Sequence, residues 1–403
     1  MLRIGIIREG KIPSDSRVAF SPLQCKWLMS HFPNLEILVQ PSIHRCYSDH
    51  EYAMQGIKIK ENLEECDILF GIKEVPLHSL IPNKTYLFFS HTRKKQAYNQ
   101  ALFREIIKRK ITLIDYECFQ NENKQRILGF GYFAGIVGAH NGLMAYGNRT
   151  GAFKLSRACD QISYKNMLLM YDSIRLPEIK IAVTGSGRVA SGVLELMTLL
   201  KIKKVNPSDF QSNHFNEPVF TQLKGADLYQ SISGYEFIRE DFFENASDYS
   251  CKFYPYTKIT DILINGIYWD EKIPKLFECE NLSETDFKIQ TIADITDDKH
   301  GSVPCNLGDS TIDDPVYGID KITYKRTDPY LPGSVDVMAV GNLPNELPRE
   351  ASEHFGNQLL KYIFEDLISG GSPVIDRATM VKNGKITSCF EYLTDYAGGI
   401  PTL

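Results

Sequence analysis

The sequence predicts an α/β protein made of two Rossmann-like domains with parallel sheets, and three observations lead to this fold class. Short apolar runs alternate with helix-compatible segments along the first 150 residues. A glycine-rich turn then joins a β-branched strand to a helix at residues 185–190, where a second alternating region begins. The chain of 403 residues has room for two or three domains of ~150 residues each.

The first domain is predicted from apolar runs that are too short for helices. The N-terminal run reads LRIGIIRE, and EILVQ, DILFGIKE, TYLFFSH and ITLIDYE follow it. Between the first two runs, Ser21 and Pro22 open a helix that is expected to reach Met29, because serine caps helix N-termini and proline suits the first turn. Strand, helix and strand at this rhythm indicate a parallel sheet.

The domain boundaries follow from two segments that read as long interdomain helices. Between residues 129 and 147, small residues recur every three or four positions, which lets a helix pack closely on its neighbours. A C-terminal stretch, NELPREASEHFGNQLLKYIFEDLIS, has apolar residues at helical spacing and is expected to return the chain to the first domain. The expected domains are therefore 1–147 plus 342–403, and 148–341. The segment 206–258 has little periodicity and receives no assignment.

Composition excludes several classes of function. The 45 basic and 50 acidic residues give a net charge of −5, so no general positive field exists to hold nucleic acid or a membrane surface. The longest near-apolar run, residues 127–139, is shorter than the ~20 residues that cross a bilayer. The charged N-terminus does not read as a secretory signal, so we expect a cytoplasmic protein. The nine cysteines form no CxxC pair, and we expect no metal site.

The turn after IKIAVT predicts a dinucleotide site. Gly185 makes the turn, Gly187 lets the backbone approach a pyrophosphate, and Ala190 is the small third position that packs helix on strand. The phosphate would then lie at the helix N-terminus, where free N–H groups favour negative charge. The competing interpretation is a Rossmann-like core whose glycines serve packing only.

The second strand is expected to end near Asn206 in KKVNPSDF, where an acidic residue should bind the adenosine ribose. The nearest carboxylate, Asp209, lies beyond Pro207, so that acid is missing from its usual place. No arginine replaces it to meet a 2′-phosphate, and NAD is therefore expected rather than NADP.

These motifs give the chain a family resemblance over nearly its whole length. It resembles the lysine-forming, NAD-dependent saccharopine dehydrogenases, relatives of alanine dehydrogenase and of nicotinamide nucleotide transhydrogenase. The motifs that carry the resemblance are KIPSDSRVAFSP, GIKEVP, FFSH, IDYECF, RILGFGYFAGIVGA, GSGRVASG and NLPNELPREAS. It implies two α/β domains with the active-site cleft between them. The implied reaction oxidises saccharopine to an imine, which water splits into L-lysine and 2-oxoglutarate.

The resemblance also implies the site residues. Lys73 and His91 match the catalytic acid–base pair, and both follow apolar runs at the carboxyl ends of expected strands, where open α/β sheets build their sites. The positions matching the substrate site, which must bind three carboxylates, are Lys11, Arg17, Lys94, Arg126, Glu74 and Glu117. Those matching the cofactor site are Gly185, Ser186, Gly187, Arg188, Val189, Ala190, Asp298 and Asn342.

One departure leaves other functions open. Lysine-forming dehydrogenases usually carry an aspartate where this chain has Gly341, and glycine cannot replace that charge. Besides the saccharopine dehydrogenase interpretation, an alanine dehydrogenase-like enzyme acting on another amino acid and a nucleotide-binding pseudoenzyme therefore remain alternatives.

Overall fold

The structure is a computed structural model that describes residues 1–161, 163–308 and 310–398. The chain forms two compact units, of which the first comprises Met1–Phe130 with the chain from Pro348 onward, and the second Gly131–Leu347. Both contain an eight-stranded, mostly parallel sheet, so the predicted fold class is confirmed. The expected boundaries at 147 and 341 fall inside the second unit, because helix α4 (Gly131–Thr150) packs on that unit's sheet.

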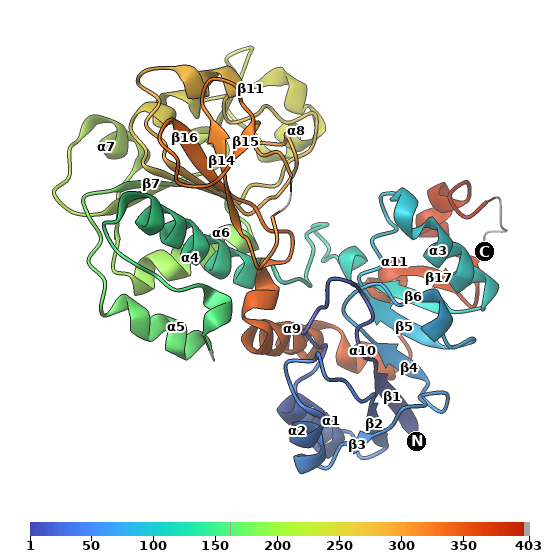
Figure 1. The fold of residues 1–403 in the computed structure, drawn as a ribbon. Helices are drawn as coiled ribbons and strands as arrows, with labels where there is room; N and C mark the ends of the chain where they lie inside the picture. Colours follow the sequence, from blue (N-terminus) through green and yellow to red (C-terminus); the bar gives the residue numbers. More distant parts are fainter. Residues whose placement is uncertain (162, 309, 399–403) are drawn as a thin grey trace. The chain divides into compact units, whose positions relative to one another are not determined.

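The sheet of the first unit has the strand order β18-β17-β6-β5-β4-β1-β2-β3. Its strands are β1 (Leu2–Ile6), β2 (Leu35–Val39), β3 (Lys58–Ile59), β4 (Ile68–Phe70), β5 (Thr85–Phe88), β6 (Thr112–Asp115), β17 (Thr379–Lys382) and β18 (Lys385–Ile386). Strands β1 to β6 pair in parallel, and β17 pairs antiparallel with β6 (Figure 1). The carboxyl ends of β1, β4, β5 and β6 therefore share one edge of the sheet.

The first helix of this unit begins as the sequence predicts. Helix α1 (Pro22–His31) has Ser21 as its N-cap, and the side chains of Ser21 and Gln24 each accept a hydrogen bond from the other's backbone N–H. The remaining helices of the unit are α2 (Asp49–Met54), α3 (Gln100–Lys108), α9 (Pro348–Tyr362), α10 (Phe364–Ile368) and α11 (Pro373–Ala378).

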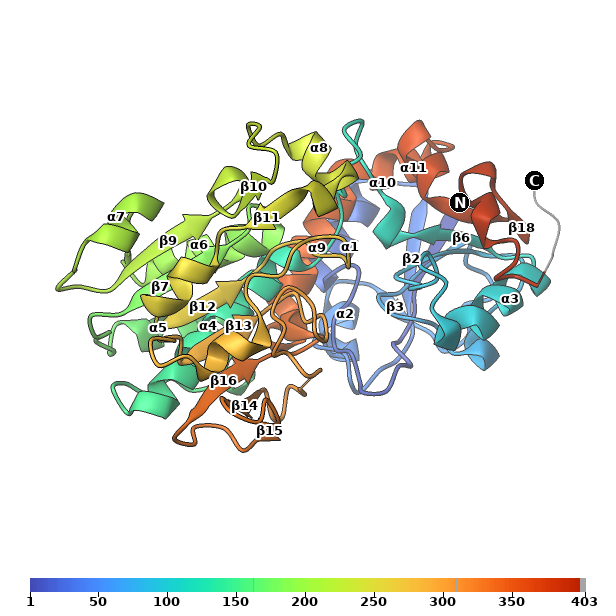
Figure 2. The ribbon, with the colours of Figure 1, turned by 90° about the horizontal axis from the view of Figure 1, so that it is seen from above.

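The sheet of the second unit has the order β15-β14-β16-β13-β12-β7-β9-β8. Its strands are β7 (Lys180–Thr184), β8 (Lys203–Lys204), β9 (Val219–Leu223), β12 (Ile262–Asn265), β13 (Thr291–Asp294), β14 (Val316–Asp320), β15 (Arg326–Thr327) and β16 (Ser334–Met338). In this sheet β8, β9, β7, β12, β13 and β16 pair in parallel, and Figure 2 shows β9, β7, β12, β13 and β16 in a row. At its other end β14 pairs antiparallel with β16 and with β15.

Helix α4 and helix α6 (Arg188–Leu199) approach each other at backbone distance. A Cβ atom on Gly192 would lie 1.9 Å from the carbonyl oxygen of Tyr132, and one on Gly135 would lie 2.0 Å from that of Val189. The sequence predicts that the small side chains within residues 129–147 allow close helix packing, and this prediction is confirmed. Helix α5 (Tyr164–Tyr171) follows α4 in the chain.

The unassigned segment 206–258 supplies β9 to this sheet and forms several further short elements. These are α7 (Pro207–Ser212), the antiparallel pair β10 (Tyr229–Ser231) and β11 (Tyr249–Cys251), and α8 (Arg239–Glu244). Buried aromatic side chains of the segment, among them Phe210, Phe242 and Phe253, belong to one hydrophobic cluster with Ala182 of β7 and Leu263 of β12. Each element is too short to show a period, and the aromatic cluster holds them together.

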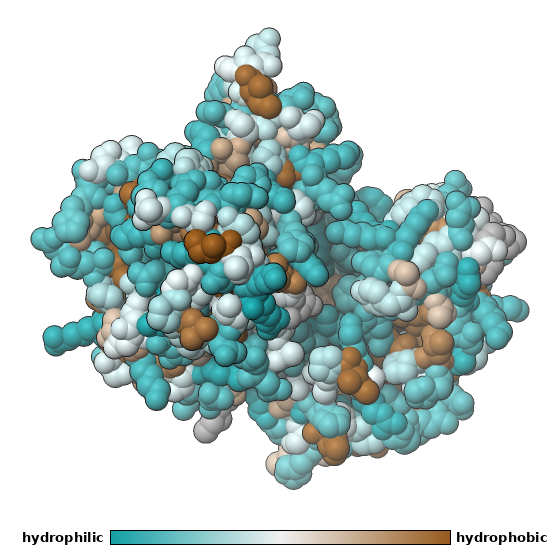
Figure 3. Space-filling model, turned by 45° about the horizontal axis from the view of Figure 1, so that its top comes forward, coloured by the Kyte–Doolittle hydropathy of each residue, from teal (hydrophilic) through white to brown (hydrophobic). Residues whose placement is uncertain are grey.

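The face drawn in Figure 3 is mainly hydrophilic, and its hydrophobic side chains stand apart from one another. Single exposed apolar residues are normal on a protein surface. Within the described ranges, the helices are all too short or too polar to pass through a bilayer.

Candidate active site

The two residues expected to exchange protons lie beyond neighbouring strands of the first unit. Lys73 follows β4 and His91 follows β5, so both emerge from the carboxyl edge of the sheet. Both side chains are partly buried. His91 has a backbone φ of +49°, a left-handed conformation that is uncommon for residues other than glycine and that gathers at functional sites.

Glu74 links His91 to a second cation. Its Oε1 lies 2.7 Å from Nδ1 of His91 and accepts a hydrogen bond from the side-chain amide of Asn99 at 3.1 Å. Its Oε2 accepts a hydrogen bond from Nζ of Lys11 at 2.9 Å. Burial raises the pKa of Glu74, but the hydrogen bonds and charges of His91 and Lys11 outweigh burial and hold that pKa well below its usual range. Glu74 is therefore an ionised carboxylate at neutral pH.

Lys73 sits where an ammonium group is disfavoured. Burial, and then the positive charge of Arg17, lower the pKa of Lys73 to about 8, although Asp15 opposes the shift. The carboxyl group of Glu9 fixes the backbone at this point, because it accepts the N–H of Ile72 at 2.7 Å and that of Lys73 at 2.8 Å. Burial, and then the charge of Asp15, raise the pKa of Glu9 to about 8. A lysine with this pKa is available as the neutral amine near physiological pH.

Arg17 is buried and is already paired with Asp15. Its Nη2 lies 2.6 Å from Oδ2 of Asp15 and its Nε donates to Oδ1 at 2.9 Å, with both side chains buried. Its guanidinium carbon lies 4.2 Å from the ring centroid of Phe130. Burial raises the pKa of Asp15, but Arg17 outweighs burial and lowers it to about 2. Arg17 thus acts on Lys73 through its charge, while Asp15 occupies two of its donors.

The other expected substrate residues are less closely gathered. Lys94 is exposed, and Arg126 is exposed with its guanidinium carbon 5.2 Å from the ring centroid of Phe89. Glu117 is half-buried just after β6, where its backbone N–H donates to Asp115 at 2.7 Å. The structure therefore gathers Lys11, Glu74 and His91 into one network.

A cavity of about 440 Å³ adjoins this network. Its polar lining includes Lys11, Glu74 and Asn99, and its apolar lining includes Leu77 and Leu102. A ligand with an aliphatic chain and an anionic group would match both walls.

The glycine-rich loop of the second unit fits a dinucleotide. Gly185 has φ +105°, and a Cβ there would lie 2.6 Å from the carbonyl oxygen of Gly266, so only glycine suits the turn. A Cβ on Gly187, the N-cap of α6, would meet nothing within 4 Å, which leaves open space over the helix N-terminus. Ala190 is buried in the first turns of α6, as the motif requires. The loop therefore has the turn and the open backbone that a pyrophosphate needs.

Only part of the expected cofactor set lines a cavity here. A cavity of about 440 Å³ contacts Gly185, Ser186 and Gly187, and Arg188 and Val189 begin the helix that follows them. The rest of its wall consists of Lys224, Gly225, Leu228, Tyr229, Phe237, Arg239, Phe242, Phe243, Gly266, Ile267 and Tyr268.

Asp298 and Asn342 come after β13 and β16, whose carboxyl ends lie along the same edge as the loop. Asp298 is exposed and Asn342 is half-buried, and neither lines this cavity.

The acid that binds the adenosine ribose is expected after residues 203–204, but the strand order shows that this segment does not lie next to β7. Residues 203–204 form only β8 at the sheet edge, and β9 lies between β8 and β7. Asp209 is in α7, where its carboxylate accepts a hydrogen bond from the side chain of Asn206 at 2.7 Å. The residue that follows the strand next to β7 is Lys224.

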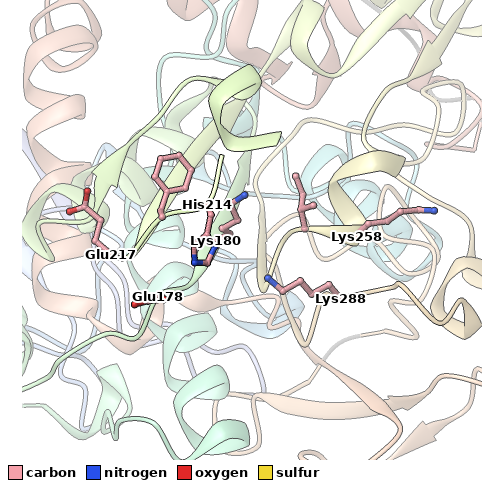
Figure 4. Close-up of a pocket in the computed structure, with 8 residues that line it drawn as sticks. Glu178, Lys180, His214, Glu217, Lys258 and Lys288 are labelled. Carbon is pink, nitrogen blue, oxygen red and sulfur yellow. The ribbon is translucent and has the colours of Figure 1, made fainter. Parts of the chain in front are cut away.

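A second pocket of this unit contains three lysines, at the opposite edge of the sheet (Figure 4). Lys180 donates to the backbone carbonyls of Phe210 and Asn213. Lys258 pairs with Asp286 at 2.8 Å, and Lys288 pairs with Asp261 at 3.2 Å. Each of the three ammonium groups thus has a partner within the protein, so we assign these lysines a structural role and not a ligand-binding one.

The N-terminal part of the chain resembles a known protein family. Residues 5–137 match the family model described as the N-terminal domain of alanine dehydrogenase/PNT. Among solved structures, an L-alanine dehydrogenase superposes with a TM-score of 0.65 at 14% identity, covering 98% of this chain and 99% of that one. The transhydrogenase from Sinorhizobium meliloti gives a TM-score of 0.61 at 13% identity over 95% of this chain and 99% of its own. At these identities the structural likeness concerns the fold.

Two curated relatives with similar sequences are named for enzymes that act on lysine-related compounds. The NAD(+), L-lysine-forming saccharopine dehydrogenase of Yarrowia lipolytica is 24% identical over 92% of this chain and 94% of its own length. The mitochondrial alpha-aminoadipic semialdehyde synthase of Rattus norvegicus is 28% identical over 89% of this chain, which spans 44% of that relative's length. The chain thus covers less than half of such synthases. The resemblance to saccharopine dehydrogenases within the alanine dehydrogenase and transhydrogenase superfamily is confirmed.

Proposed function

We propose that this chain is an NAD-dependent oxidoreductase that oxidises the secondary amine of saccharopine and releases L-lysine and 2-oxoglutarate. The observation that carries the proposal is Lys73, whose pKa of about 8 makes it a base near neutral pH beside the His91–Glu74–Lys11 network. The full-length likeness to saccharopine dehydrogenases supports the same enzyme class.

The cofactor would be held by the second unit. Gly185, Ser186 and Gly187 would receive the pyrophosphate, because their backbone is open at the start of α6. A bound nicotinamide supplies the acceptor for the hydride that leaves the carbon next to nitrogen.

Lys73 would take the proton of the substrate's ammonium group. A secondary amine must lose this proton before its C–H bond can give up a hydride, and a base with a pKa near the working pH does this well. Burial, which lowers the pKa of Lys73, thus prepares the residue for its task.

His91 would serve the hydrolytic half of the reaction. Water must add to the imine carbon, and the departing lysine nitrogen must gain a proton as the C–N bond breaks. The ring of His91 has Nδ1 at Glu74, so its Nε2 is the atom that can exchange protons with water or substrate. Glu74 orients the ring and balances its charge when the ring is protonated.

The cations expected at the substrate site would bind the substrate's carboxylates. Lys11 is partly exposed and borders the cavity, whereas Lys94 and Arg126 are exposed. Arg17 is buried and shared with Asp15, so it contributes mainly to the charge at Lys73. This number of positive groups favours a substrate with several carboxylates over alanine, which has one.

The proposal is tested by mixing the protein anaerobically with NADH, lysine and 2-oxoglutarate and following the absorbance of NADH. We expect oxidation that requires both lysine and 2-oxoglutarate. Equal oxidation with pyruvate and ammonia would favour an alanine dehydrogenase-like reaction instead. Absence of both NADH oxidation and NADH binding would overturn the enzyme assignment and leave the pseudoenzyme alternative.

A further inference from the structure

Asn99 stands at the start of a helix that its side chain does not cap. It is the N-cap residue of α3, and asparagine is among the residues that most often cap a helix through the side chain. The Asn99 side chain makes no capping hydrogen bond, although the residue is buried. Because buried amides are hydrogen-bonded in folded proteins, this side chain serves other partners.

The amide nitrogen of Asn99 joins two groups of the candidate active site. Nδ2 donates to the backbone carbonyl of Ser90 at 2.9 Å and to Oε1 of Glu74 at 3.1 Å. Both partners act as acceptors, since Glu74 is ionised, so the amide must turn its NH₂ group and not its oxygen towards them. Asn99 thus ties the Glu74 carboxylate to the residue that directly precedes His91.

Ser90 is itself held in place by a buried carboxyl group. Its backbone N–H donates to Oδ2 of Asp115 at 3.0 Å, and its hydroxyl donates to the same oxygen. Phe88 pairs with Asp115 across β5 and β6, so these hydrogen bonds fix the chain just beyond the end of β5. His91 takes its left-handed backbone conformation at this point. The carbonyl group that Asn99 binds therefore belongs to a firmly held part of the sheet edge.

The carboxylate that Asn99 holds decides which nitrogen of the His91 ring is free. Oε1 of Glu74 lies 2.7 Å from Nδ1 of His91, so an ionised Glu74 keeps a proton on Nδ1 and leaves Nε2 for substrate or water. Another partner of this carboxylate is Lys11, whose side chain is 35% exposed. A partly exposed lysine can follow a carboxylate that moves, whereas Asn99 is buried and bound to the backbone. Asn99 is therefore the contact that fixes Glu74 relative to the ring.

We propose that Asn99 is a positioning residue for the proton transfers of His91. By holding Glu74 to the Ser90 carbonyl, it keeps the neutral ring in the tautomer that carries its proton on Nδ1. This inference rests on the proposed function, since it concerns the acid–base residue of the same site. Asn99 acts on the reaction through Glu74 and the ring.

The first test is steady-state kinetics of saccharopine oxidation by Asn99→Ser and Asn99→Ala. Serine can cap α3 but has one hydroxyl proton and cannot bridge two acceptors, so this variant separates the proposed role from folding. We expect kcat to fall roughly ten- to a hundredfold, as loss of a hydrogen bond to a charged group would give, while NADH affinity stays unchanged. In a His91→Gln background the same substitutions should have no further effect, because the ring that they misplace is already gone.

Gln100→Ala is the matched control. Gln100 is the next residue in the chain, and its side-chain amide also donates to a backbone carbonyl, that of Tyr396, at 3.0 Å. This variant loses a comparable hydrogen bond and should keep kcat. Thermal melting of each variant separates a local effect from unfolding. An equal loss of kcat in Gln100→Ala would assign the effect of both residues to general stability and overturn the inference.

The second test observes the ring directly and needs no catalysis. Proton–nitrogen NMR of the chain with isotope-labelled histidine distinguishes the two neutral tautomers, and the His91→Gln spectrum identifies the signals of His91 among those of the nine histidines. With the ring neutral, we expect a proton fixed on Nδ1 in the unaltered chain and a mixture of tautomers in Asn99→Ser. An unchanged tautomer in that variant, an unchanged kcat, or an equal loss of kcat in the His91→Gln background overturns the inference and leaves the proposed function intact. Absence of saccharopine oxidation by the unaltered chain overturns the proposed function, on which the inference rests.

Discussion

Lys73→Met tests the centre of the proposed site, because it removes the amine and keeps much of the side chain's length. At the ordinary lysine pKa only about one side chain in 3,000 is neutral at pH 7, whereas a pKa of about 8 makes it roughly one in ten. Its surroundings thus raise the neutral fraction of Lys73 roughly 300-fold. Loss of a general base costs roughly 10²–10⁴-fold in rate, and we expect kcat of the variant to fall by that amount.

The assay is the pH dependence of kcat/KM for saccharopine oxidation, together with calorimetric titration of NADH. The unaltered chain should gain activity as pH rises towards about 8, where Lys73 loses its proton, and the variant should lack this limb. NADH affinity should be nearly unchanged, because the glycine-rich loop belongs to the other unit. Lys108→Met, at an exposed position on α3, serves as the control. Full activity in the Lys73 variant, or survival of the limb near pH 8, would refute the catalytic role.

Two further predictions concern the stability of the fold, and a third concerns Gly341, which stands where lysine-forming dehydrogenases usually carry an aspartate. Asp15→Asn breaks a buried ion pair and should cost roughly 3–5 kcal/mol of unfolding free energy at pH 7. The pKa of Asp15 is about 2 in the folded chain, below its value in the unfolded chain, so the stabilisation is present above pH ~4 and is lost as pH falls through ~2. The difference in urea midpoint between variant and unaltered chain should therefore shrink at pH 3. Gly192→Ala places a methyl group 1.9 Å from the Tyr132 carbonyl oxygen, so we expect a lower melting temperature and a loss of roughly 1–3 kcal/mol; an unchanged melting temperature would contradict the close helix contact. Gly341→Asp, at an exposed position, should raise NAD-linked activity about tenfold if that position faces the cofactor, and a stable variant with unchanged kinetics would show that it does not.

The sequence predicts the parts of the site that depend on local patterns. Apolar runs indicate where β4 and β5 lie, and parallel pairing brings their carboxyl ends to one edge, so Lys73 and His91 could be placed without a structure. The glycine-rich turn is equally local, since its strand, loop and helix follow one another directly.

The remaining parts depend on pairings that the sequence does not display. Glu9 contacts the Lys73 backbone from 64 residues away, and no periodic pattern marks that contact. The sequence does not indicate Lys224, because the chain forms the edge strand β8 before it forms β9 beside β7, and the first carboxylate after the β8 segment is Asp209. Asp15 was visible in the motif two residues before Arg17, but only the folded loop shows that the two side chains pair.

The antiparallel strand β17 has a consequence for how this protein is made. The ribosome releases the first six strands of the first unit early, yet β6 must wait for a partner that emerges after the whole of Gly131–Leu347. The second unit is continuous in sequence and can complete its core as soon as it leaves the exit tunnel, because domains generally fold as units during synthesis. In the meantime β6 is an open hydrogen-bonding edge, which other chains could pair with. A cell that synthesises this protein quickly would thus rely on chaperones at that stage more than the stability of the finished fold suggests.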